Sequence, residues 1–186
     1  TTLGGIGTTR SGAVLLTVSM TGAFVGCAFT ACTATSTEGT AWGGAVMHYN
    51  TDSLFSGCTF TDCGVASAYV GSVNGGERPP HDRPIAWAAS FSSSSRPYVL
   101  PPAAGALYFI MKSVVAIDDC TFKRCSAFGL SPNTTGYGGA VCVDNTVCDL
   151  SHTSVTNCSA DYGGALAALS GVTTMSNGSF FSGHAT

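Results

Sequence analysis

Cysteine is the residue type in this sequence with the most evident chemistry. The 186-residue chain contains nine cysteines, and six of them form three blocks of the pattern Cys-x-Phe-x-x-Cys, at Cys27–Cys32, Cys58–Cys63 and Cys120–Cys125. Cysteine pairs repeated at one spacing are typical of a disulfide framework built in an oxidising compartment. The simplest pairing joins the two cysteines of each block, with a fourth bridge at Cys142–Cys148 and with Cys158 left over.

Two other states of these cysteines stay open. If successive blocks were stacked, equivalent cysteines would lie within the roughly 4.4–6.8 Å Cα separation of a disulfide, so pairing between blocks is the rival arrangement. Unpaired cysteine is also common in protein interiors. A zinc site would need Cys-x-x-Cys pairs or histidine ligands, and the spacing here is different. We therefore expect no metal site.

Three Asn-x-Ser/Thr sequons offer acceptors for N-linked sugar, at Asn133, Asn157 and Asn177. Asn133 falls in a segment of variable length. The other two occupy positions that the repeat described below turns toward solvent. In a secreted chain, exposed sequons of this kind are sites of N-glycosylation, and N-linked glycans are expected at all three.

Acidic residues give little support for catalysis. A glycosidase needs two carboxylates about 5–10 Å apart, and the segments around Asp52, Asp118–Asp119 and His184 resemble polygalacturonase motifs only superficially. The repeat places Asp52 six residues before its block and Asp118–Asp119 directly before theirs, hence at different positions around the molecule. Ten acidic residues are few for a calcium-dependent lyase, and no nucleophile elbow, P-loop or HExxH motif is present. We expect no catalytic residue and no cofactor.

The composition excludes further classes of protein. Charged residues make up 9% of the chain and the net charge is −3, against roughly 25% charged residues in an ordinary domain. A nucleic-acid-binding surface would need clustered Lys and Arg, so no nucleic-acid partner is expected. A hydrophobic share of 45% argues against disorder. Residues 11–37 carry no charge, but Gly, Thr and Ser interrupt the run, and we expect no membrane span.

A short motif recurs along the chain and defines the elements that position these residues. Gly-Gly-Ala occurs at 43–45, 138–140 and 163–165, with weaker copies at 11–13 and 104–106. Each copy is followed 13 or 14 residues later by a cysteine block or a degenerate form of it. The distance from a block to the next Gly-Gly-Ala varies, so only this segment tolerates insertion, as loops on one side of a solenoid do. The longest insertion is predicted at 64–103, with a polar, Pro-rich loop around Glu77 and His81.

Aligning the copies produces columns of like side chains. Three columns are expected to face inward: Phe24, Phe55, Ile117, Leu150 and Met175; Phe29, Phe60, Phe122, Val155 and Phe180; and the small residues Ala34, Val65, Ala127, Ala160 and Ala185. Polar residues alternate with them at a period of two, which is the period of a β-strand. A repeat of about 25 residues with several short strands predicts an all-β fold. We expect a single-stranded right-handed parallel β-helix of about five rungs with one long inserted loop.

The motifs resemble a known family. Gly-Gly-Ala-[Ile/Leu/Val] alternating with Phe-x-x-Asn marks the repeats of chlamydial polymorphic membrane proteins and related right-handed β-helix surface proteins. Here Cys32, Cys63, Cys125 and Cys158 stand at the Asn position of Phe-x-x-Asn. The resemblance covers nearly the whole chain except the insertion, and it implies the β-helix fold and a place at the cell surface.

The sequence therefore favours a structural or adhesive role over an enzymatic one. We expect residues 1–186 to form a single β-helix domain, extracellular or on the cell surface, disulfide-bonded and glycosylated. The chain begins before one copy of the motif and stops where another is due, without a capping element. Exposed strand edges invite pairing, so we expect either end-to-end self-association into a fibre or filament, or neighbouring segments of a longer solenoid. The alternatives are a carbohydrate-active β-helix enzyme, lyase or hydrolase, and a carbohydrate-binding module that uses the 64–103 insertion.

Overall fold

The protein is an all-β molecule built of parallel strands. The computed structural model describes residues 2–5, 13–17, 21–36, 41–67, 105–130, 135–181 and 184–185. In these ranges the regular elements are strands, with no helix. Consequently, no helix long and apolar enough to cross a membrane occurs in the part of the chain described.

The strands are short, from two to six residues. Their bounds are β1 (Thr2–Gly5), β2 (Val14–Thr17), β3 (Thr21–Val25), β4 (Ala28–Thr30), β5 (Thr33–Ser36), β6 (Val46–Tyr49), β7 (Asp52–Ser56), β8 (Thr59–Thr61), β9 (Gly64–Ser67), β10 (Leu107–Ile110), β11 (Val114–Asp118), β12 (Thr121–Lys123), β13 (Ser126–Gly129), β14 (Val141–Asp144), β15 (Thr146–Ser151), β16 (Ser154–Thr156), β17 (Ser159–Ala160), β18 (Leu166–Ala168), β19 (Gly171–Ser176), β20 (Ser179–Phe181) and β21 (His184–Ala185).

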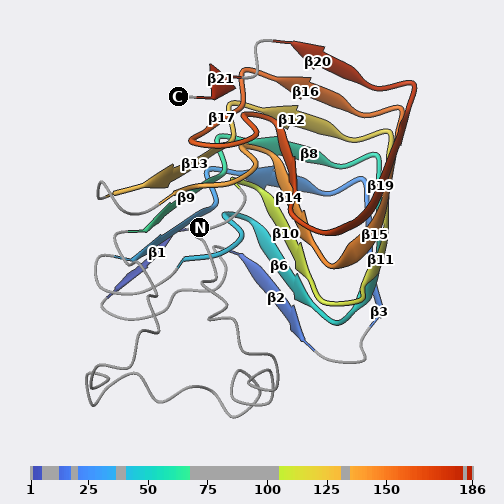
Figure 1. Cartoon of the computed structure of the whole chain (residues 1–186), viewed down its shortest axis with the longest axis horizontal. Coiled ribbons are helices and arrows are strands. Elements are labelled where there is room, and N and C mark those ends of the chain that lie inside the picture. The colour runs from blue at the N-terminus through green and yellow to red at the C-terminus, as the bar shows by residue number, and fades with distance from the viewer. Residues whose placement is uncertain are drawn as a thin grey trace.

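These strands form four parallel sheets, and each strand pairs with the one four places further along the chain (Figure 1). Sheet I has the order β1-β5-β9-β13-β17-β21, and sheet II has the order β2-β6-β10-β14-β18. Sheet III has the order β3-β7-β11-β15-β19, and sheet IV has the order β4-β8-β12-β16-β20. The chain therefore passes through the four sheets in a fixed sequence and repeats the circuit, as in a β-solenoid. In Figure 1 the early strands lie at one end of the stack and β18 to β21 at the other.

The predicted alignment of the columns is confirmed, since the members on neighbouring strands are direct partners. Two members expected to face inward, Met175 and Phe180, are 48% and 39% exposed, and the column of Ala34 forms a separate small buried cluster with Ala41. Phe29, Phe60 and Phe122 are direct partners in sheet IV, with ring centroids 4.9 and 4.8 Å apart and nearly parallel planes. Phe24 stacks on Phe55 in the same way at 4.7 Å. These spacings equal the distance between neighbouring strands in a sheet. The stacked rings belong to one buried core cluster that lies between the sheets.

The Gly-Gly-Ala motif is required by two separate constraints. Its first glycine has a positive φ, +64° at Gly138 and +63° at Gly163, a conformation that costs most other residues energy. Its second glycine lies against the next circuit of the chain: a Cβ on Gly105 would come 2.0 Å from the carbonyl oxygen of Gly139, and one on Gly139 2.1 Å from that of Gly164. The motif therefore sets both the turn and the closeness of stacking at the start of sheet II.

Sheet II differs from the other sheets because both of its faces are buried. Strands β6, β10 and β14 are buried at every position, whereas the strands of sheets III and IV alternate. The outer face of sheet II carries a second hydrophobic cluster: Trp42, Met47, Tyr49, Tyr108, Ile110, Cys142 and Ala167. The sequence columns did not reveal this second cluster, because uninterrupted apolar runs show no period of two.

The predicted 64–103 insertion begins too early. Residues 64–67 form β9 and pair with β5 and β13, so they belong to the repeat itself. The rest of the predicted insertion, including Glu77 and His81, lies outside the described residues.

Candidate functional site: the cysteine columns and the open edge

Seven of the nine cysteines line up in two columns at two turns of the circuit. Cys27, Cys58 and Cys120, followed by Thr153, lie between sheets III and IV; Cys32, Cys63, Cys125 and Cys158 lie between sheets IV and I. Backbone hydrogen bonds join the successive levels of each column. The amide of Thr59 donates to the carbonyl of Cys27 at 2.9 Å, and the amide of Ser126 donates to that of Cys63 at 2.9 Å. Eight of the nine thiols are buried.

All nine cysteines are free thiols, and the geometry opposes the pairing expected within each block. A three-residue strand separates the two cysteines of a block, as β8 separates Cys58 from Cys63. Three extended residues span about 10 Å, whereas the Cα atoms of a disulfide lie at most about 7 Å apart. The same correction applies to Cys27–Cys32 and Cys120–Cys125.

The fourth expected bridge, Cys142–Cys148, is not formed either, because its two cysteines belong to different hydrophobic clusters. Cys142 belongs to the hydrophobic cluster on the outer face of sheet II. Cys148, on β15, points into the central core. The geometry therefore opposes the bridges expected within each block and between Cys142 and Cys148. The stacked cysteines of neighbouring levels are free thiols in this structure, although their Cα separation of about 4.8 Å fits the disulfide range, so pairing between blocks stays a prediction. Cys158 is an ordinary member of its column and not an unpaired remainder.

The thiols act as hydrogen-bond donors that satisfy carbonyls at the turns. Cys58 Sγ lies 3.5 Å from the carbonyl oxygen of Ser56, two residues earlier, and 3.3 Å from that of Phe24 in the preceding circuit. Thr153 lies in the same column, two levels beyond Cys58. Its hydroxyl makes the same two contacts, 2.9 Å to the Ser151 carbonyl and 3.4 Å to the Ile117 carbonyl. A small donor is thus what the position requires, and cysteine and threonine both supply it.

Burial keeps most of these thiols protonated. Desolvation raises the pKa of Cys120 and of Cys148 to about 12. Cys125 lies between two thiols in its column, and its hydrogen bonds to Cys158 and Cys63, together with burial, raise its pKa further. The same contacts lower the pKa of Cys158 and Cys63. Neutral donors suit an apolar corner, because an isolated buried thiolate would be costly.

The candidate catalytic carboxylates are not brought together. Asp52 accepts a hydrogen bond of 2.9 Å from the amide of Val114 on the outer face of sheet III. Asp118 aligns with Ser56, four residues from Asp52 along the strand direction, which is about 13 Å. That separation exceeds the span of a glycosidase pair. The side chain of His184 lies outside the described residues.

These outer acids instead form ladders between levels. Asp118 lies 2.7 Å from the Ser151 hydroxyl, which donates to it, and 3.0 Å from His152 Nδ1, and these contacts lower its pKa. Arg124 donates two hydrogen bonds to Asp62, of 2.7 and 2.8 Å. In the described residues, no group of three or more His, Cys, Asp or Glu side chains is placed to hold a metal ion.

Two of the three sequons lie where a glycan would have room. Asn157 and Asn177 are exposed residues in turns, with φ of +54° and +51°. They follow β16 and β19, on the outside of the circuit. Asn133 lies outside the described residues.

The core contains a buried polar group that the sequence pattern did not predict. His48 is fully buried on β6, and its Nδ1 lies 2.7 Å from Ser53 Oγ and 3.1 Å from Thr51 Oγ1. Its ring packs against Phe55 and Phe109, with centroid distances of 5.4 and 4.9 Å. Desolvation lowers its pKa to about 4, so the imidazole is neutral at physiological pH. A histidine in an otherwise apolar stretch was the available signal.

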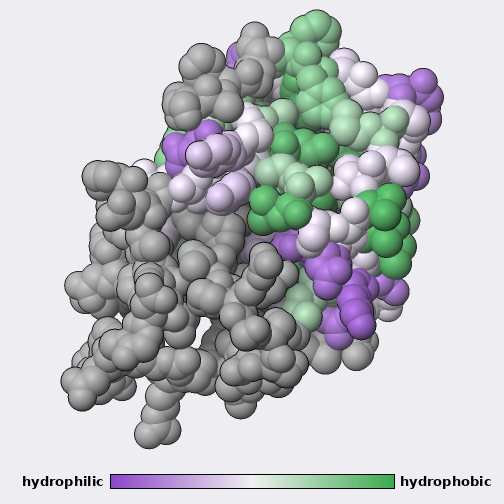
Figure 2. Space-filling model, in the orientation of Figure 1, coloured by the Kyte–Doolittle hydropathy of each residue, from purple (hydrophilic) through white to green (hydrophobic). Residues whose placement is uncertain are grey.

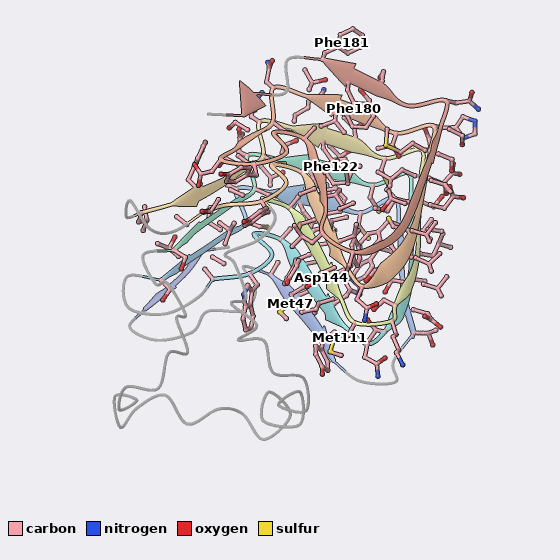
Figure 3. All side chains as sticks on the ribbon, in the orientation of Figure 1. Met47, Met111, Phe122, Asp144, Phe180 and Phe181 are labelled. Atoms are coloured by element: carbon pink, nitrogen blue, oxygen red, sulfur yellow. The ribbon has the colours of Figure 1, made fainter. Side chains whose placement is uncertain are left out.

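The end of the stack formed by β18 to β21 leaves core residues uncovered. In the column of Phe122, which is fully buried, Phe180 is 39% exposed. In the column of Phe55, also fully buried, Met175 is 48% exposed. Figure 2 shows hydrophobic side chains reaching the surface at this end, and Figure 3 shows Phe180 and Phe181 on the last strand of sheet IV. Because β18, β19, β20 and β21 each end the order of their sheets, four strand edges surround this apolar face. We term this face, with its four edges, the C-terminal edge.

Comparison of the chain with models of protein families, with curated proteins and with solved structures finds no match in any of the three.

Proposed function

We propose that the protein is a right-handed parallel β-helix of five rungs that serves as a structural, adhesive element of an extracellular fibre or appendage. The observation that carries the proposal is the C-terminal edge. There, the columns that stack Phe29, Phe60 and Phe122 at regular spacing stop at a partly exposed Phe180. An apolar face framed by unpaired strand edges is a template for another rung.

The surface chemistry supports a structural role. The described ion pairs join adjacent levels of the same stack, as between Asp62 and Arg124. Such ladders reinforce stacking, and they leave no convergent pair of carboxylates. Regular stacking of this kind suits a stiff rod that presents its outer faces to partners.

Exposure of the sequons supports a place outside the cell. Asn157 and Asn177 lie in outward turns, so glycans there would leave the sheets undisturbed. Free thiols do not oppose this proposal. The thiols whose pKa burial raises, such as Cys120 and Cys148, are poor substrates for oxidation, so for them an extracellular setting does not require the disulfides that the spacing first suggested.

The partner proposed for the C-terminal edge is a further rung of the same type, either from a second copy or from a neighbouring solenoid segment. Its inward residues would extend the columns that end at Met175 and Phe180. Its strands would pair with β18, β19 and β20 in parallel register, as β14, β15 and β16 already do.

Electron microscopy and sedimentation of the purified 186-residue chain test this proposal. We expect rods or filaments longer than one molecule and a concentration-dependent sedimentation coefficient. Met175→Lys should abolish association, because a charge would enter the apolar face. Thr174→Lys is the matched control, since Thr174 is the exposed neighbour on the outer side of β19. A parent chain that stays a monodisperse 18.7 kDa monomer at high concentration would reject self-association.

A further inference from the structure

The two ends of the stack do not match. Among the described residues, sheet I contains six strands and each of the other sheets contains five. Among the described strands, the first, β1, and the last, β21, both belong to sheet I. The stack therefore has one extra strand in a single sheet, and that strand matters when two copies are placed end to end.

Placing a second copy on the C-terminal edge creates a direct competition. If its β2, β3 and β4 continue sheets II, III and IV, its β1 arrives in sheet I at the level that β21 already occupies. The register makes the two strands equivalent. Thr2 pairs with Thr33 and His184 with Ser159, which belong to one column; Leu3 and Ala185 belong to the adjacent column. Thr2–Leu3 of one copy and His184–Ala185 of the other would therefore occupy the same position, beside β17.

Of the two strands, β21 is held by fewer contacts. It aligns with β17 through two residue pairs, whereas β1 aligns with β5 through four. Displacing β21 would let the second copy pair along β18, β19 and β20, which comprise three, six and three residues. It would also cover Met175 and Phe180, which are 48% and 39% exposed. The strand pairing and apolar burial gained exceed the two residue pairs lost.

We propose that β21 is an exchangeable cover strand that regulates self-association: a second copy's β1 displaces it and takes its place on β17. This proposal rests on the end-to-end assembly proposed above. The partner strand is β1 of a second copy, and detachment of β21 controls the assembly. The C-terminal edge is then partly closed in sheet I while β21 is in place. Association then requires β21 to detach from β17. Detachment is slow if it comes first, and it depends on protein concentration if the second copy displaces the strand.

Two variants of the 186-residue chain test the exchange. Deleting residues 182–186 removes β21, and we expect the concentration for half-maximal association, measured by sedimentation velocity, to fall at least tenfold. Joining Ser159→Cys with His184→Cys would lock β21 to β17, because paired Cα atoms of adjacent strands lie near disulfide distance. We expect the locked form to stay monomeric under oxidising conditions and to associate again when reduced, so that each sample is its own control.

The outcomes separate this inference from the proposed function. Phe180→Lys, with Phe181→Lys as the outward-facing control, reports on the edge itself. Lys123 occupies the column of Phe181, so lysine is compatible with that position. If Phe180→Lys blocks association but neither the deletion nor the lock changes it, the edge assembles and the exchange is wrong. If the deletion weakens association, β21 is part of the contact and the exchange is also wrong. If the parent and the truncated chain both remain monomeric, the exchange and the proposed self-association both fail. Far-UV circular dichroism confirms folding of each variant.

Discussion

Replacing phenylalanine by alanine at two levels of one column measures how much the stack stabilises its members. Phe122 is fully buried in sheet IV, with the ring of Phe60 stacked at 4.8 Å on one side and Val155 on the other. Removing a phenylalanine ring from a packed core costs about 3–5 kcal/mol. Phe180 occupies the same column but is 39% exposed and has a strand on one side only. Scaling the usual burial energy of the side chain by the buried share gives about 1–2 kcal/mol.

We therefore expect Phe122→Ala to lower the free energy of unfolding by about 2–3 kcal/mol more than Phe180→Ala, the difference between the two costs. Urea unfolding followed by circular dichroism measures both, at a protein concentration low enough to keep the C-terminal edge uncovered. Constant m-values would show that the same surface unfolds in each variant. Equal losses for the two variants would show that the depth of a residue in the stack does not set its contribution to stability.

Four further predictions concern the polar core, the turns and the thiols. The pKa of His48 is about 4 in the folded protein and about 6.5 in the unfolded chain. Between these two pH values the imidazole is protonated in the unfolded chain and neutral in the folded one. Stability should be full above pH 6.5 and should fall by about 3 kcal/mol as the pH drops toward 4; urea midpoints against pH should flatten in His48→Phe. Gly139→Ala, whose Cβ would lie 2.1 Å from a carbonyl oxygen, should cost about 3 kcal/mol, the upper end of the usual range for overpacking. Gly57→Ala, whose Cβ would meet no atom nearer than 4.0 Å but which has a φ of +61°, should cost about 1–2 kcal/mol; similar melting temperatures for the two variants would contradict the packing argument. Cys58→Thr should stay within about 1 kcal/mol of the parent, while Cys58→Val, which lacks a donor, should lose about 1 kcal/mol more. Thiol titration of the unreduced, denatured chain should count nine thiols, and a count of three or fewer would restore the disulfide framework.

The register of the sheets was predictable because large residues recur at constant spacing. The offset between Gly-Gly-Ala and the phenylalanine of the block varies by one residue at most. A period of two within each strand then leaves a single register that buries every column. The alignment of Phe24 with Phe55, and of Ala34 with Val65, follows from that constraint alone.

The outer cluster and the buried histidine were not predictable in the same way. The outer side chains of sheet II, such as Met47 and Tyr108, are buried, so its strands lack the alternation that identifies a face. Asp144 lies on the same sheet (Figure 3). It is buried and accepts a 2.7 Å hydrogen bond from the Ser170 hydroxyl. A sequence pattern reports which side faces the core only when the other side faces water.

The cysteine pattern misled for a physical reason that applies to repeat proteins in general. A constant spacing between two cysteines suggests a cross-link only if the spacing has no other cause. Here each block covers one short strand of sheet IV and the turns on either side of it, so the constant spacing of its two cysteines is the spacing of those two turns along the chain. The cysteines recur because the buried levels of the turns on either side of sheet IV hold a small donor, which Thr153 supplies where the repeat departs from cysteine. Had a disulfide been the reason for the pattern, the loss of one member should have been matched by the loss of its partner. Cys158 is instead retained beside Thr153, donating to the Thr156 carbonyl as the other members of its column donate to theirs.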